Sequence, residues 1–180
     1  WLGSNMELVI FNPADGNIFR YREYSHSFLE DSKGRYWITT FDSGLAEYSI
    51  TGGPVRYYRK EDGIASNHTY CVLEDPTNKL WISTSNGLSR FDPENSSFLN
   101  FHKKDGLLNN VFHYGAAYKT SDGDLLFGGI NGFVRFNPLN VKTNGSQAPI
   151  VLTELRVLNR TVGIGKEKKA ILKKSIHVTN

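Results

Sequence analysis

Residues 73–88 read LEDPTNKLWISTSNGL, and most of this stretch occurs twice in the chain. Residues 29–45, LEDSKGRYWITTFDSGL, share its Leu-Glu-Asp start, its Trp-Ile-Ser/Thr-Thr centre and its Gly-Leu end. Trp37 precedes Trp81 by 44 residues. Self-similarity at a fixed period of this length is typical of repeat architectures, so the repeat decides the fold class.

Two further partial copies extend the repeat in both directions. Residues 122–133, DGDLLFGGINGF, carry Leu126 at the tryptophan position, 45 residues after Trp81. At the start of the chain, the ten-residue step from Trp1 to Phe11 equals the step from Trp81 to Phe91, so the sequence opens in the middle of a repeat.

Each copy contains four short β-prone runs that are separated by turn residues. Four antiparallel strands per period of about 40–45 residues indicate a β-propeller blade. We therefore predict an all-β fold: a partial β-propeller of about three to four four-stranded antiparallel blades, followed by the first strands of a β-sandwich-like domain. A helical or leucine-rich solenoid does not fit, because Gly or Pro interrupts every candidate helical window. An ordinary β-sandwich fits less well, since it requires no repeated unit. In the copy around Trp81, the predicted strands are Tyr70–Glu74, Leu80–Thr84, Leu88–Phe91 and Phe98–His102.

The recurring large side chain on the second strand of each copy is expected to form the blade core. A tryptophan ring there fills the space between neighbouring blades and buries about 150–250 Å². The alternative is a sugar-stacking platform, but a ring that recurs at the blade period favours the core. The residues at this position are Trp1, Trp37, Trp81 and Leu126.

A second element recurs between copies as Asp-Gly followed by an asparagine. It occurs as Asp62-Gly63 with Asn67 and as Asp105-Gly106 with Asn110. Asp-Gly is a turn signal, because Gly accepts positive φ and Asp bonds its own backbone. The interval from Trp1 to Trp37 is only 36 residues and lacks this element, which predicts a shortened connection.

The repeat pattern ends after residue 141. Residues 142–149 have the polar, Gly- and Pro-containing composition of a linker. Residues 150–180 begin with a partly alternating run that predicts a strand of a new sheet. We interpret the organisation as C-terminal propeller blades at 1–141, a linker at 142–149 and the truncated start of a second β-domain at 150–180.

The composition permits a packed core and argues against nucleic-acid binding by the main body. The chain is 39% hydrophobic and 22% charged, with a net charge of +3. Residues 166–174 hold five lysines and one Glu, or +4, so the rest of the chain is close to neutral. The single cysteine, Cys71, lies in an apolar run and is expected to be an inert core thiol.

No motif for catalysis, for a cofactor or for a metal is recognisable in the sequence. The five histidines lack metal-ligand spacing, and one cysteine cannot complete a thiolate site. The carboxylate pairs Glu61-Asp62 and Glu74-Asp75 fall in predicted turns, and adjacent residues at a strand end point apart. We therefore interpret both pairs as solvated turn charges rather than as a glycosidase acid and base.

The unit at 73–92 strongly resembles the two-component regulator propeller repeat. The element at 105–110 resembles the loop that links such repeats, and residues 127–138 look like the last blade of the family. The run at 148–159 is similar to the opening of the triple-tyrosine domain that follows these propellers. The pieces also occur in the order found in the family.

The resemblance implies a non-catalytic, periplasmic sensor. In this family the propeller lies outside the inner membrane, and the triple-tyrosine domain connects it through a membrane helix to a cytoplasmic histidine kinase. The ligands are typically oligosaccharides cut from glycans. The implied partners are an oligosaccharide, the remaining blades, the kinase of the same chain and a possible second copy in a homodimer. There are two alternatives. One is a propeller enzyme that acts on polysaccharide as a lyase or hydrolase, and the other is a protein-interaction scaffold.

The loop after Asp105-Gly106 and its equivalent in the previous copy are the best candidates for ligand contact. Amides and histidines can hydrogen bond to sugar hydroxyls, and ring faces can stack on a pyranose. The alternative is that the asparagines cap turns while the rings pack between blades. The candidates are Asn109, Asn110, Phe112, His113 and Tyr114, with His68 and Tyr70 in the previous copy.

Overall fold

The computed structural model describes residues 2–3, 7–12, 15–49, 53–141, 155–157 and 160–162, with side chains from residue 7 to residue 141 of these ranges. The chain divides into two compact units, Trp1–Val141 and Lys142–Asn180. In the second unit the described residues form one antiparallel hairpin of β15 (Leu155–Val157) and β16 (Arg160–Val162). Trp1, the linker at 142–149, the basic run at 166–174 and the rest of the predicted second domain lie outside the described residues.

The first unit consists of four antiparallel sheets, which we call the first to fourth blades. Strands that follow one another in the chain pair in each blade, so every blade is a meander. The predicted strands of the third blade agree with the structure to within one residue at each end. The first blade contains β1 (Leu2–Gly3), β2 (Leu8–Phe11) and β3 (Ile18–Tyr21), and the second contains β4 (Ser25–Glu30), β5 (Tyr36–Thr40), β6 (Leu45–Ser49) and β7 (Gly53–Tyr58). The third blade contains β8 (Thr69–Glu74), β9 (Leu80–Thr84), β10 (Gly87–Asp92) and β11 (Ser97–Phe101). The fourth blade contains β12 (Phe112–Lys119), β13 (Leu125–Gly129) and β14 (Gly132–Phe136).

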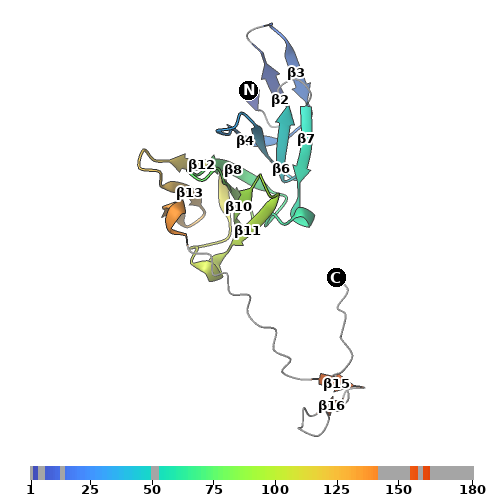
Figure 1. Cartoon of the computed structure of the whole chain (residues 1–180), viewed down its shortest axis with the longest axis vertical. Helices are drawn as coiled ribbons and strands as arrows, with labels where there is room; N and C mark the ends of the chain where they lie inside the picture. Colours follow the sequence, from blue (N-terminus) through green and yellow to red (C-terminus); the bar gives the residue numbers. More distant parts are fainter. Residues whose placement is uncertain are drawn as a thin grey trace. The chain divides into compact units, whose positions relative to one another are not determined.

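The starting strands of the second, third and fourth blades converge. Strand β8 contacts both β4 and β12, and β4 also contacts β12 (Figure 1). These three strands are therefore the inner strands of their blades, as expected when blades are arranged around a common axis. The described residues form no α-helix; short 3₁₀ turns occur at η1 (Lys60–Asp62), η2 (Lys103–Asp105) and η3 (Pro138–Asn140).

A buried aspartate organises the turn that joins the first two strands of the third blade. One oxygen of Asp75 accepts hydrogen bonds from the backbone N–H groups of Thr77, at 2.7 Å, and Lys79, at 3.1 Å. The other oxygen accepts a hydrogen bond from the indole Nε1 of Trp81 at 2.9 Å. The same carboxylate therefore closes the turn and fixes the tryptophan ring.

The second blade repeats this arrangement with Asp31 and Trp37. The indole Nε1 of Trp37 donates to Asp31 at 2.9 Å, and the Arg35 Nε donates to the same oxygen at 2.7 Å. Burial by itself would raise the pKa of Asp31, but the hydrogen bonds from Trp37 and Arg35 outweigh it and hold that pKa below its ordinary value.

The interpretation of the Glu74-Asp75 pair as solvated turn charges was wrong. Asp75 is only 4% exposed, because its carboxylate lies against the edge of the Trp81 indole. Glu74 contacts the neighbouring blade, where its carboxylate accepts hydrogen bonds from Ser32 N at 2.9 Å and Ser32 Oγ at 2.7 Å. Both acids are structural, one within a blade and one between blades.

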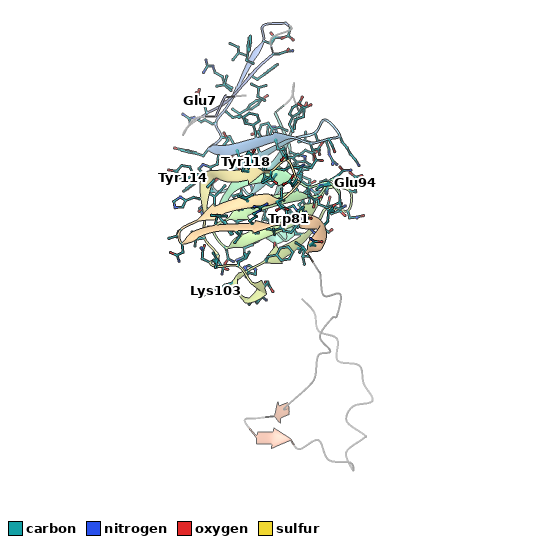
Figure 2. All side chains as sticks on the ribbon, turned by 90° about the vertical axis from the view of Figure 1, so that its left-hand side faces the viewer. Glu7, Trp81, Glu94, Lys103, Tyr114 and Tyr118 are labelled. Carbon is teal, nitrogen blue, oxygen red and sulfur yellow. The ribbon has the colours of Figure 1, made fainter. Side chains whose placement is uncertain are left out.

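Each of the two buried tryptophans is enclosed by one ring of its own blade and one ring of the next blade. Trp81 is 1% exposed and lies within the stacked sheets (Figure 2). Its ring centroid is 5.3 Å from that of Phe101 on the outer strand of the same blade and 4.7 Å from that of Phe136 in the fourth blade. Offset and edge-to-face ring pairs of this kind stabilise a core beyond their buried area.

Trp37 is equally buried and has equivalent neighbours. Its ring is 6.0 Å from Tyr58 of its own blade and 5.6 Å from Phe91 of the third blade. Equivalent sets of three rings thus form the interface between the second and third blades and the interface between the third and fourth blades.

The fourth blade replaces both members of the Asp–Trp pair. Leu126 occupies the tryptophan position and is half-buried. Thr120 occupies the position of Asp75, and its hydroxyl accepts a hydrogen bond from Asp124 N at 3.0 Å. The turn is therefore kept, while the hydrogen bond to the second strand is absent together with the indole that would donate it.

The short connection predicted between the first two blades consists of residues 22–24. Its central residue, Glu23, is buried and accepts a hydrogen bond from the Tyr57 hydroxyl at 2.6 Å. Burial and this hydrogen bond raise the pKa of Tyr57 to about 12, so the tyrosine is the proton donor and the glutamate the acceptor.

Replacement of either buried tryptophan by alanine should destabilise the protein by about 3–5 kcal/mol, because it removes a large ring from between two blades. Urea unfolding of the Trp81→Ala and Trp37→Ala variants measures this loss. Leu126→Ala is the comparison, since Leu126 is half-buried and should cost less. A loss below about 1 kcal/mol for both tryptophans, within the range of ordinary surface changes, would refute their role in the core.

Candidate functional site

The inner strands of the second and third blades each contain a β-bulge near their first residue. In β4 the register shifts between Ser25 and Ser27, so His26 is the extra residue. In β8 it shifts between Thr69 and Cys71, so Tyr70 is the extra residue. A bulge frees a residue from the ladder and re-aims its side chain. The two bulges therefore place rings at equivalent positions of adjacent blades.

The inner strand of the fourth blade has a larger irregularity at the same place. Phe112 pairs with Gly129 and Ala117 pairs with Phe127, so residues 113–116 face Gly128 alone. Gly115 has φ +68°, a backbone conformation that glycine adopts without strain. This excursion carries His113 and Tyr114 away from the ladder.

The bulged residues and the loops beside them form a contiguous group of rings, which we call the seven-ring cluster. Neighbouring ring centroids in the cluster lie between 5.0 and 6.3 Å apart. Its members come from three blades and the connections between them. They are Tyr24, His26, Phe41, His68, Tyr70, His113 and Tyr114.

The outer rings of the cluster are open to solvent, whereas its centre is covered. Tyr24, Phe41 and Tyr114 are 51%, 50% and 66% exposed. His26 contacts Phe41, Tyr70 and Tyr114, and its Nε2 atom is buried without a hydrogen-bond partner among the described residues. Burial lowers the pKa of His26, so this imidazole is neutral at pH 7. Exposed rings around an uncharged polar centre can bind a ligand that has both apolar faces and hydroxyl groups.

The structure brings four of the seven predicted contact residues into the cluster: His68, Tyr70, His113 and Tyr114. Phe112 is instead a core residue, 4% exposed and packed with Cys71 and Trp81. Asn109 faces its own loop, where its side-chain oxygen accepts a hydrogen bond from Val111 N at 2.9 Å.

Asn110 belongs to a connection that repeats between the blades. Its side-chain oxygen accepts a hydrogen bond from Lys103 N at 2.7 Å, and Asn67 accepts one from Lys60 N at the same distance. The aspartate of each Asp-Gly pair caps the same turn, since Asp105 accepts a hydrogen bond from His102 N at 2.9 Å. The oxygen of Asn110 is thus already used within the loop.

Three members of the cluster were missed from the sequence: Tyr24, His26 and Phe41. The repeat contained a signal for His26. His26 precedes Leu29 by three residues, and the equivalent residue of the next copy precedes Leu73 by three residues. That counterpart is Tyr70, which was among the candidates.

The single cysteine is enclosed in the fold. Cys71 is buried, which raises the pKa of its thiol, and its Sγ contacts the His113 carbonyl oxygen at 3.7 Å. Within the part of the chain that the structure describes, no group of three or more His, Cys, Asp or Glu side chains is arranged to hold a metal ion. None of the described helices is long and apolar enough to cross a lipid bilayer.

Comparison with known proteins identifies the repeat. Residues 63–86 match the family model of the two component regulator propeller. The match includes the whole of β8 and β9, and it confirms the resemblance of the unit at 73–92 to this repeat. The chain therefore carries a two-component regulator propeller repeat.

The chain is also similar to a histidine kinase. It is 30% identical over 120 residues to histidine kinase P4 of Formosa agariphila, an alignment that covers 67% of this chain and 9% of that protein. The chain thus spans less than a tenth of the curated relative it matches.

Solved structures confirm the fold class. The extracellular domain of a putative hybrid two component system from B. thetaiotaomicron matches with a TM-score of 0.64 and 15% identity, over 78% of this chain and 21% of that one. Virginiamycin B lyase from Staphylococcus aureus matches with a TM-score of 0.55 and 15% identity, over 74% of this chain and 49% of that one. At such low identity these likenesses show the fold alone, an all-β partial propeller.

Replacement of Asn110 by alanine should destabilise the protein by about 1 kcal/mol, because Lys103 N loses its hydrogen-bond acceptor. Asn67→Ala at the equivalent position should cost a similar amount. Asn110→Asp, which keeps the acceptor oxygen, should cost less. Urea unfolding measures all three variants. Equal stability of Asn110→Ala and the natural protein would show that this oxygen is free for a ligand.

Proposed function

We propose that this chain is part of the extracytoplasmic sensor region of a hybrid two-component system, and that it binds an oligosaccharide released from a glycan. The similarity to a histidine kinase and to a regulator propeller repeat supports a sensor. The structural neighbour from B. thetaiotaomicron is the extracellular domain of a putative hybrid two component system, which supports the extracytoplasmic location. In this proposal the chain itself performs no chemistry.

The observation that carries the proposal is the seven-ring cluster. Aromatic side chains that keep half of their surface exposed, such as Tyr24 and Phe41, present flat apolar faces to solvent. The C–H face of a pyranose stacks on such a ring, while its hydroxyl groups require polar partners at the rim. The rings also lie on a rigid scaffold, since the inner strands are fixed by the packing of three blades.

The signal is proposed to pass from the propeller to the second unit. The histidine kinase of the relative is expected beyond this second unit in the same chain, so a ligand on the propeller must change how the two units are arranged. Such coupling requires a ligand that prefers one of two arrangements by about 1–3 kcal/mol. Residues 142–149 are proposed as the hinge; a passive linker is the alternative, and a Gly-Ser insertion there that leaves signalling unchanged would favour it.

The proposal predicts binding without turnover. Isothermal calorimetry of the complete extracytoplasmic region against a panel of oligosaccharides should identify a ligand, and chromatography should recover that ligand uncut. Cleavage of the oligosaccharide would favour a propeller enzyme, and a protein partner with no sugar-dependent stabilisation would favour a scaffold.

Substitution of Phe41 or of Tyr70 should then weaken binding to a similar extent. Phe41→Ala and Tyr70→Ala should each reduce the affinity by about twofold to tenfold, which corresponds to the loss of one aromatic contact. Leu108→Ala is the control, because Leu108 is an exposed apolar residue in a neighbouring connection and is not one of the seven rings. Equal affinities for the natural protein and both ring variants would place the sugar site elsewhere.

A further inference from the structure

Two rings of the cluster, Tyr114 and His26, are stacked across two blades. Their centroids are 5.5 Å apart and their planes differ by only 19°. Tyr114 comes from the fourth blade and His26 from the second, so the contact spans the third blade between them. Tyr114 lies at the edge of the stacked sheets (Figure 2) and keeps 66% of its surface exposed. It therefore covers His26 without being enclosed itself.

The imidazole of His26 has a polar atom without a partner within the described part of the chain. The imidazole Nε2 is buried and makes no hydrogen bond with any described residue. Phe41 and Tyr70 contact the same imidazole at 6.1 and 5.9 Å, with their planes inclined by 64° and 55°. Tyr114 is thus the one near-parallel neighbour of His26 among these rings. A buried and unpaired nitrogen is unfavourable, so the covered arrangement loses a hydrogen bond that an open one would gain.

The segment that carries Tyr114 lies outside the regular ladder of the fourth blade. Residues 113–116 face Gly128 alone, and the ladder pairs on both sides, at Phe112 and Ala117, do not depend on them. Gly115 has positive φ, and no atom lies within 4 Å of the position where its Cβ would be. The Tyr114 hydroxyl makes no hydrogen bond with the described residues. The segment is held to the third blade through Cys71, whose thiol contacts the His113 carbonyl oxygen at 3.7 Å and is hydrogen-bonded to the backbone of Gly115 and Ala116.

We propose that Tyr114 is a displaceable cover over His26, and that a pyranose ring of the ligand takes its place. This inference rests on the proposed function. The flat C–H face of a pyranose with equatorial hydroxyl groups is apolar and can lie on the uncovered imidazole between the inclined rings of Phe41 and Tyr70. A hydroxyl group of the same sugar satisfies His26 Nε2, which no part of Tyr114 does.

The alternative is that Tyr114 is itself the surface on which the sugar stacks. The two arrangements predict opposite effects of removing the ring. If Tyr114 is a cover, only the open fraction of the protein binds, and Tyr114→Ala removes that penalty and strengthens binding. If Tyr114 is the stacking surface, the same substitution weakens binding.

The cover is tested first without a ligand. Diethyl pyrocarbonate modifies accessible imidazoles, and mass spectrometry of the complete protein measures the rate at each histidine. Tyr114→Ala should raise the modification rate of His26 by about tenfold, whereas Tyr114→Phe, which keeps the stacked ring, should leave it low. His102 serves as the internal reference and Leu108→Ala as the control variant. Equal modification rates of His26 in the natural protein and in Tyr114→Ala would contradict the proposal that Tyr114 covers His26.

The second measurement is the affinity of the same variants for hexasaccharides of glucose, mannose and xylose and their uronic acid counterparts. For a hexasaccharide that binds, Tyr114→Ala should bind severalfold more tightly, and His26→Ala about tenfold more weakly. Weaker binding by both variants would overturn the cover while leaving the proposed function intact. Fast modification of His26 in Tyr114→Ala, with no binding by any form of the protein, would contradict the proposed function and the assigned ligand but not the covered histidine.

Discussion

A buried carboxylate on the first turn of a blade, hydrogen-bonded to an indole on the second strand, is the contact on which this structure depends. Asp75 and Asp31 each close a turn with one oxygen and fix Trp81 or Trp37 with the other. A charged acceptor at 4% exposure is stable only because every strong donor around it is aimed at it. The indole is held in one orientation as a result, and its faces are presented to the rings of the same blade and the next one. The packing of the second blade on the third, and of the third on the fourth, thus depends on a contact made inside the second and the third blade.

The position of the seven-ring cluster follows from that rigidity. The inner strands β4, β8 and β12 contact one another. Each of them has an irregular register near its first residue, so the residues freed from the three ladders lie close together. Each bulge gives up regular pairing for at least one residue, which is tolerated only in a sheet stabilised elsewhere. The fourth blade carries the largest irregularity and also lacks the Asp–Trp pair, having Thr120 and Leu126 instead. The buried carboxylates and the seven-ring cluster therefore lie at opposite ends of the inner strands of the second and third blades.

Much of the fold was predictable because its information is local and repeated. The strands around Trp81 follow from alternating β-prone runs and turn residues, and they agree with the structure to within one residue. The role of Asp75 was not predictable in the same way, because an acid in a turn is usually solvated and its burial depends on the sheet that packs over it. Four of the seven rings in the cluster were predicted: His68, Tyr70, His113 and Tyr114 were chosen for their chemistry. Phe41 and Tyr24 join them only through tertiary contacts, with His26, with His68 and with each other. Asn110 has suitable chemistry for a sugar, yet its own loop uses it.

The central claim is that the carboxylate and the indole act as one unit, and a double-mutant cycle on Asp75 and Trp81 tests it most directly. Asp75→Asn keeps the size of the side chain and an oxygen for the turn, and Trp81→Phe keeps a ring but removes the N–H donor. Urea unfolding of the natural protein, both single variants and the double variant gives the coupling energy. The account predicts a coupling of about 1–3 kcal/mol, because either change alone already breaks the same charged hydrogen bond. Additive losses, with a coupling below about 0.5 kcal/mol, would show that the two side chains stabilise the blade independently and would contradict the account.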